Sequence, residues 1–140
     1  QTINMETKVN LKESLEKVKE LVKNKAEKAI WGYDDCIVVV DTVYPFYIEV
    51  SVEIRYLYYD VFVEAHHYEQ EIGGVELVNR IDIDLSFDDD YVDECKANGI
   101  EIPITEDELS DVKDELVALI ENEVDEFNDY KKPSYDSRFC

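Results

Sequence analysis

The chain has 140 residues, with 14 Lys and Arg against 35 Asp and Glu, a formal charge of −21 at pH 7 and a hydrophobic fraction of 45%. This length and hydrophobic content favour one folded domain over a disordered chain, and no apolar run approaches the roughly 20 residues that cross a membrane. Because DNA and anionic lipid surfaces repel so acidic a chain, we expect no direct binding of nucleic acid and no membrane association.

The first predicted element is a helix over residues 10–30. Its apolar residues recur at spacings of three and four, and Asn10 followed by Glu13 fits a capping box. The predicted core face consists of Leu11, Leu15, Val18, Val22, Ala26 and Ala29. We expect Gly32 to end the helix, with Trp31 folded onto the core nearby.

Two segments of different pattern then predict strands. The run 36–41 is apolar almost throughout, which is typical of a strand that is buried on both faces or nearly so. Over residues 46–56, apolar and polar residues alternate strictly, which predicts a strand with one buried face.

The alternation reverses at Tyr56 and Leu57, so we expect a bulge or a tight turn there. Gly73 and Gly74 are then expected to close a hairpin into a last strand that ends at Phe87. The residues expected on the polar face after the reversal are Tyr58, Asp60, Phe62 and Glu64.

Two further helices complete the predicted fold. Residues 88–90, all Asp, are expected to cap a short helix that Gly99 ends, and Thr105 with Glu108 predicts the start of a second long helix. The fold class expected is α+β, a two-layer sandwich. An antiparallel sheet of three or four strands would carry the N-terminal and C-terminal long helices on one face.

The charge is distributed unevenly along the chain. Residues 1–31 carry seven Lys and five Glu, residues 32–130 carry four basic and 29 acidic residues, and residues 131–140 carry three basic and one acidic residue. The acids alternate with a periodic apolar pattern, which indicates the outer face of folded elements. We therefore predict one acidic domain over residues 1–130 and a short basic flexible tail over 131–140.

The cysteines favour a reducing compartment. Cys36, Cys95 and Cys140 are odd in number and form no CxxC pair, so we expect a cytoplasmic protein with Cys36 in the core and Cys140 as a free thiol. Cleavage of a signal peptide before Gln1 is the alternative.

Catalytic and metal motifs are not evident in the sequence. His66 and His67 are adjacent, so on a strand they point to opposite faces, and no nucleophile motif accompanies them. The acids between Asp84 and Glu94 offer oxygen ligands for calcium, but they lack the glycine and the preceding helix of an EF-hand. We expect no enzyme activity, no cofactor and no metal, and keep calcium binding or a small enzyme as the third interpretation.

Acidic residues follow one line along the second long helix, at spacings of three, four and seven, and Asp129 continues the line. Like charges one turn apart cost a helix roughly 0.2–0.5 kcal/mol per pair, so this line of charge costs stability. We call these residues the acidic stripe: Asp107, Asp111, Asp114, Glu121 and Asp125.

The polar face of the predicted sheet repeats the pattern, with carboxylates on neighbouring strands and aromatic residues among them. Directly opposed like charges are unfavourable in a sheet, and exposed aromatics are typical of interface centres. The candidate residues on this face are Glu49, Glu53, Tyr58, Asp60, Phe62, Glu64, Asp82 and Asp84.

These surfaces predict a non-enzymatic interaction protein that binds and blocks a basic, nucleic-acid-binding protein. Carboxylates spaced a few Å apart would take the place of phosphates, so that the chain acts as a nucleic-acid mimic. In charge and size it is similar to small phage or mobile-element inhibitors of restriction or CRISPR enzymes. The alternative is a structural or assembly module of a phage or bacterial complex, which pairs through the Tyr-rich sheet face with a scaffold protein or as a homodimer.

Overall fold

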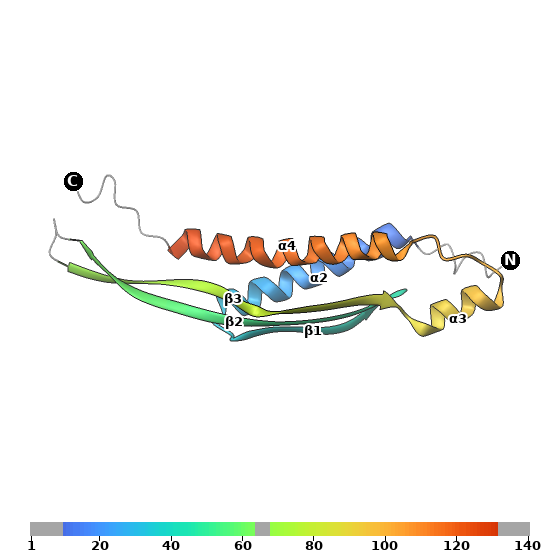
Figure 1. The fold of residues 1–140 in the computed structure, drawn as a ribbon, viewed down its shortest axis with the longest axis horizontal. Coiled ribbons are helices and arrows are strands. Elements are labelled where there is room, and N and C mark those ends of the chain that lie inside the picture. The colour runs from blue at the N-terminus through green and yellow to red at the C-terminus, as the bar shows by residue number, and fades with distance from the viewer. Residues whose placement is uncertain (1–9, 64–67, 132–140) are drawn as a thin grey trace.

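The computed structural model describes residues 10–63 and 68–131, and between residues 59 and 72 it describes the backbone only. Within these ranges the chain forms three helices and one three-stranded antiparallel sheet (Figure 1). In chain order the elements are α2 (Leu11–Trp31), β1 (Cys36–Val43), β2 (Phe46–Val63), β3 (Tyr68–Phe87), α3 (Asp89–Ala97) and α4 (Glu106–Lys131). Both long helices lie on the same side of the sheet, which confirms the predicted two-layer α+β sandwich.

Both long helices begin at the predicted caps. The Asn10 side chain accepts a hydrogen bond from the Glu13 N–H at 3.0 Å. The Thr105 hydroxyl accepts one from the Glu108 N–H at 3.2 Å, and the Glu108 carboxylate accepts one in return from the Thr105 N–H at 3.4 Å. These bonds satisfy amide groups that the first helical turn leaves without partners, so the start of each helix is fixed locally.

The sheet has the order β1-β2-β3, so β2 is central and the other two strands are edges. β1 pairs along its full length with residues 46–53 of β2, and β3 pairs along the full length of β2 on the other side. On the covered face, α2 packs against β1 and β2, while α4 packs against β3 and α2.

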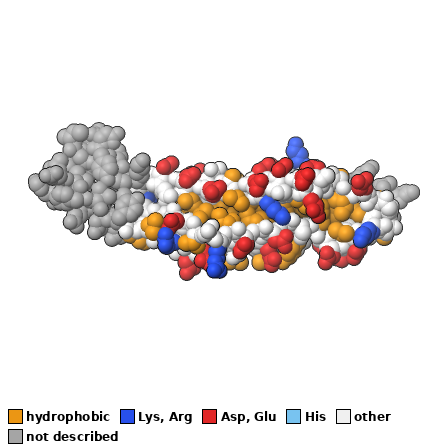
Figure 2. All heavy atoms as spheres, in the orientation of Figure 1, with side chains coloured by type: hydrophobic (Ala, Val, Ile, Leu, Met, Phe, Trp, Pro, Cys, Tyr) orange, Lys and Arg blue, Asp and Glu red, His pale blue; other side chains and the backbone are white. Residues whose placement is uncertain are grey.

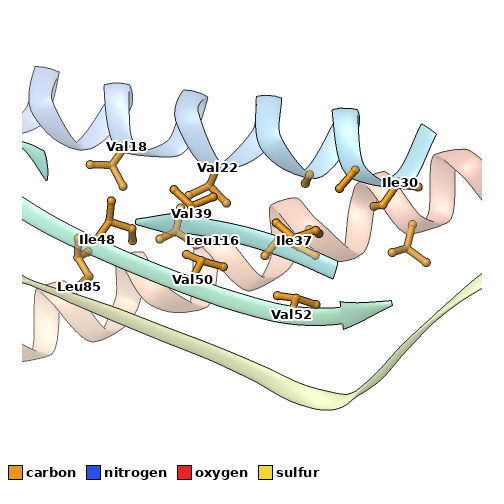
Figure 3. Packing of buried hydrophobic residues seen from close by; sticks show 14 of the residues in the cluster. Val18, Val22, Ile30, Ile37, Val39, Ile48, Val50, Val52, Leu85 and Leu116 are labelled. Carbon is orange, nitrogen blue, oxygen red and sulfur yellow. The ribbon is translucent and has the colours of Figure 1, made fainter. Parts of the chain in front are cut away.

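One hydrophobic core fills the space between helices and sheet. Figure 3 shows Val18 and Val22 of α2 above Ile48 and Val50 of β2, with Leu116 of α4 in the same cluster. These side chains are between 0% and 2% exposed. The end of α2 is tied to the sheet by the Tyr56 hydroxyl, which donates to the carbonyls of Ala29 at 3.1 Å and Ile30 at 2.8 Å.

The prediction that the first strand is buried on both faces is wrong. Ile37 and Val39 of β1 lie in the core, but Val38 and Val40 point to the other face and are 55% and 60% exposed. Cys36 is also exposed, so it is not the core residue that the sequence suggested. The physical reason is that α2 covers one face of this edge strand and α4 lies on the same side of the sheet, over β3, so no described element covers the opposite face.

The predicted bulge also lies at a different place. β2 pairs regularly with β3 from Ile54 onward, and the register shift falls between the pairs that Val52 and Ile54 make. Only Glu53 separates these two residues on β2, whereas residues 78–80 separate their partners on β3. Tyr56 itself still packs against Phe127 of α4 and bonds to the end of α2, whereas the far ends of β2 and β3 extend beyond both long helices (Figure 1).

Gly73 and Gly74 lie inside β3 and do not form the predicted hairpin turn. Gly73 pairs with Tyr58, and a Cβ atom at residue 73 would stand 3.0 Å from the Tyr58 ring. Glycine here allows an aromatic ring to approach the backbone closely, which is the use of glycine inside a strand. Residues 64–67, between β2 and β3 in the chain, lie outside the described residues, and so does the predicted tail, 131–140, apart from Lys131, which ends α4.

Candidate interaction surface

The acidic stripe lies on the exposed side of α4. Every member is exposed, and within residues 10–63 and 68–131 none of them forms an ion pair. The α4 residues on the opposite side, among them Leu116 and Ile120, are fully buried. The helix therefore separates an apolar side, which the core needs, from a charged side that the fold leaves uncompensated.

The outer sheet face, which is the uncovered face, carries four of the predicted carboxylates. Glu49 and Asp84 are direct cross-strand partners, and Asp82 pairs with Ser51 two residues along. Glu53 lies 3.8 Å from Arg80, so it has a weak cation partner. By contrast, Glu49, Asp82 and Asp84 are exposed and make no ion pair in the described part of the chain.

The same face is partly apolar. Val38 and Val40 line a shallow depression of about 420 Å³ together with Glu49 and Asp84. Tyr47 lies nearby and is half-buried. Partial burial raises the pKa of the Tyr47 hydroxyl, and the neighbouring Glu49 carboxylate raises it further, so Tyr47 stays a neutral hydrogen-bonding group at pH 7.

The Tyr-rich face that the sequence predicted is not formed as expected. Because β2 is regular from Ile54, Tyr58 shares the helix side with Tyr56, and it is 55% exposed there. Tyr47 is thus the tyrosine that the described structure places on the outer sheet face. The side chains of Asp60 and Phe62, and the whole of Glu64, lie outside what the structure describes.

The lysines of α2 are partly used within the protein. Lys19 bridges Glu16 of its own helix at 3.1 Å and Glu115 of α4 at 2.5 Å. The hydrogen bond from Lys19 to Glu115 is the main reason that the pKa of Lys19 is raised. These contacts join the two helices and neutralise Glu115, but they reach no member of the acidic stripe.

A groove that sequence reasoning missed runs along the flank where α4 lies over the edge strand β3. It consists of two adjoining hollows of about 490 Å³ and 550 Å³, which share Leu77 and Glu121. Figure 2 shows a band of apolar side chains along this flank, with carboxylates above and below it. We call it the flank groove; its lining includes Val75, Glu76, Leu77, Val78, Arg80, Ile81, Asp82, Glu121, Val124 and Asp125.

The flank groove brings two predicted sets of residues together. Glu121 and Asp125 come from the acidic stripe, whereas Asp82 comes from the set predicted on the sheet. The members Asp107, Asp111 and Asp114 lie further along α4, toward its N-terminus, and do not line the two hollows. Sequence alone gave no signal for this groove, because it depends on α4 lying over β3 and not over β1.

The aspartates after β3 have a structural role. The Asp88 side chain caps α3 by accepting a hydrogen bond from the Asp90 N–H at 3.1 Å, as the sequence predicted. Across the part of the chain that the structure describes, no three His, Cys, Asp or Glu side chains are grouped so as to hold a metal ion.

Comparisons with known proteins add no family to this description. No family model matches the chain, and neither a curated protein nor a solved structure matches it. Among the described helices, none combines the length and the apolar content that spanning a membrane requires.

Proposed function

We propose that this protein is a non-enzymatic interaction protein whose acidic surface binds and blocks a basic, nucleic-acid-binding protein. The observation that carries the proposal is the exposed acidic stripe of α4, which has no cation partner within the described residues. Like charges at these spacings destabilise a helix, and among the stripe residues only Asp107 lies in the first turn of α4, where the helix dipole favours a carboxylate. A binding role gives this cost a physical reason.

Electrostatics supplies the mechanism. A basic protein that binds nucleic acid presents Lys and Arg at the spacing of phosphates, and carboxylates on a rigid helix offer those cations an alternative partner. The long-range field of a chain with charge −21 would accelerate the encounter. Once bound, the acidic protein covers the cations that nucleic acid needs, so the partner is blocked by competition, as in restriction or CRISPR inhibitors that act as nucleic-acid mimics.

A charge-matched capture experiment tests the proposal. One variant carries Asp107→Asn, Asp111→Asn and Asp114→Asn in the acidic stripe, and a control carries Glu13→Gln, Glu16→Gln and Glu20→Gln on α2. Both change the net charge by the same amount. Immobilised parent protein should retain a basic nucleic-acid-binding protein from host lysate at low salt and release it between about 0.1 and 0.5 M salt.

The stripe variant should lose most of this capture, and the α2 control should keep it. Purified duplex DNA should compete with the captured protein for the same cations. Capture that resists salt, or that survives equally in both variants, would contradict the proposal.

A second candidate function is supported by the exposed valines of β1. Val38 and Val40 form an apolar surface on an edge strand, which is the kind of surface that pairs with another chain in an assembly. Pairing of two copies has to overcome the repulsion between two strongly acidic chains, so it should strengthen as salt rises. Light scattering across a salt series separates the two functions, because their salt dependences have opposite sign.

A further inference from the structure

The flank groove exposes part of the core that the rest of the fold covers. The residues of β2 that face the helices, such as Ile48 and Val52, are completely buried. Their counterparts on β3, including Leu77, Ile81 and Ile83, pack against the same core but are only partly buried. The difference follows from the order of the strands, because β3 is an edge and its outer flank has no neighbouring strand.

The irregular register of β3 adds to the apolar lining. Residues 78–80 are the extra residues of the bulge, and Val78 and Arg80 from this segment both line the groove. A bulge bends an edge strand and turns a side chain to a new direction. Arg80 is 74% exposed at its side chain and lies 3.8 Å from Glu53 of β2, so it pairs weakly with the sheet and not with the stripe.

Carboxylates border the groove on both sides. Glu121 and Asp125 project from α4 one helical turn apart, and Asp82 projects from β3. These three acids make no ion pair in the described ranges, whereas Glu76 is paired with Arg55. The groove therefore combines a partly apolar floor, formed by Leu77, Val78 and Ile81, with an excess of negative charge at its borders.

We propose that the flank groove is the docking site for a positively charged amphipathic segment of the partner. Apolar side chains of that segment cover Leu77, Val78 and Ile81, while its Lys or Arg side chains reach Glu121, Asp125 and Asp82. The inference rests on the proposed function and assigns it a site and a partner chemistry: the contact is not purely ionic, as a simple phosphate mimic would make it.

The apolar floor and the carboxylates of the groove together exclude other occupants. A purely cationic segment would satisfy the carboxylates but leave the apolar floor in water, and an uncharged apolar segment would remove carboxylates from water without a counter-charge. A second copy of this chain would bring further negative charge to the borders. One amphipathic basic segment supplies both the apolar side chains that cover the floor and the cations that pair with the carboxylates.

Two synthetic peptides test the inference with the unmodified protein. One is a 14-residue amphipathic peptide of Leu and Lys, and the other has the same length and charge with every Leu replaced by Ser. Titration calorimetry should show the Leu-containing peptide binding about tenfold more tightly, since covering apolar groove residues adds to the ionic contact. Equal affinities, or no binding of either peptide at low salt, overturn the inference.

Matched variants locate the contact. Val78→Ser with Glu121→Gln alters the groove, and Val92→Ser with Glu101→Gln makes the same two exchanges away from it. The groove variant should lose about tenfold in affinity for the Leu-containing peptide, and the control should lose less than about twofold. An equal or larger loss in the control places the contact outside the groove and overturns the inference.

Amide chemical shifts of the unmodified protein give a second readout that does not depend on how a variant folds. The Leu-containing peptide should shift amides in 77–82 and 121–125, and shifts confined to 38–40 contradict the proposed site.

Failure of the proposed docking site can be told apart from failure of the proposed function. If host capture still requires the acidic stripe while the peptides fail, the docking site is wrong and the function stands; if no host protein is captured, the function fails whatever the peptides do.

Discussion

The Asn128 side chain completes the hydrogen bonding of Val75 at the edge of β3. Its Oδ1 accepts from the Val75 N–H at 2.7 Å, and its Nδ2 donates to the Val75 carbonyl at 3.3 Å. The Asn128 amide thus makes the two hydrogen bonds that a neighbouring strand would otherwise make to Val75. Because Val75 is almost fully buried, its backbone groups have little access to water if this pair is lost.

Replacement of Asn128 should therefore destabilise the fold. We expect Asn128→Ala to lower the free energy of unfolding by about 1–3 kcal/mol, since it leaves two backbone groups of Val75 without partners. Urea denaturation followed by circular dichroism measures the change. Asn128→Asp keeps an acceptor for the N–H but sets a carboxylate oxygen against the Val75 carbonyl, so it should also lose stability; if Asn128→Ala is as stable as the parent, this hydrogen-bonded pair does not hold α4 to β3.

Glu123 is a carboxylate inside the contact between α4 and α2. The residue is 4% exposed and its Oε2 has no hydrogen-bond partner among the described residues. Burial raises the pKa of Glu123, the nearby Glu126 raises it further, and a hydrogen bond with the Trp31 side chain lowers it. The smaller effects of Glu27, which raises the pKa, and Lys23, which lowers it, act in opposite directions. Its charge at pH 7 is therefore a cost to folding.

Removal of this charge should stabilise the protein in a pH-dependent way. The pKa of Glu123 is higher in the folded state than the ordinary value of 4.5 for a Glu side chain, so its cost is absent below about pH 4.5 and complete above the folded pKa. Glu123→Gln should raise the free energy of unfolding at pH 7 on the order of 1 kcal/mol. The gain should vanish near pH 4. The exposed control Glu101→Gln should show no such gain, and a destabilised Glu123→Gln at pH 7 contradicts this explanation.

At the scale of elements, β1 shows that burial depends on where the helices lie. Val39→Ala removes a buried side chain and should cost about 2 kcal/mol of unfolding free energy. Val38→Ala makes the same exchange on the exposed face and should change it by less than about 0.5 kcal/mol. Chemical denaturation of the two variants measures the contrast, and equal losses would mean that both faces of β1 are covered.

The acidic stripe predicts a gain in stability together with a loss of binding. Glu121 and Asp125 lie one turn apart on α4, so their carboxylates repel each other. Glu121→Gln with Asp125→Asn should raise the free energy of unfolding by about 0.2–0.5 kcal/mol at low salt. The same variant should bind the basic partner more weakly. A loss of both stability and binding would indicate that these acids support the fold.

Local signals in the sequence predicted the elements well. The caps at Asn10, Asp88 and Thr105 depend on a few neighbouring residues, so helix starts were confirmed. The exposure of Val38 was missed, because an apolar strand looks the same in sequence whether one or two layers cover it. Gly73 was read as a turn because sequence does not show the Tyr58 ring that crosses it.

The candidate surface was predictable only as separate parts. Helical spacing placed Glu121 and Asp125 on one side of α4, and alternation placed Asp82 on the sheet, but their convergence at one groove depends on which strand α4 covers. The partly apolar floor escaped prediction for the same reason. Residues such as Ile81 have the pattern of core residues, and only the position of β3 at the edge leaves them partly uncovered.

For the whole molecule, the separation of charge from core is the feature that the proposed function explains. Apart from the buried Glu123, the acids among the described side chains lie at the surface of the helices and the sheet, where water and salt solvate them. A basic partner would replace that solvation with direct contact. The energy of that contact is therefore expected to depend on ionic strength.

The salt dependence of affinity for the captured basic partner tests this account most directly. Titration calorimetry of the purified pair should show affinity falling at least about tenfold between 0.05 and 0.2 M salt, because several carboxylate–cation contacts are screened together. Neutralising Asp107, Asp111 and Asp114 should make that dependence less steep. An affinity that stays constant over this range, in parent and variant alike, would show that the acidic surface is not what the partner binds.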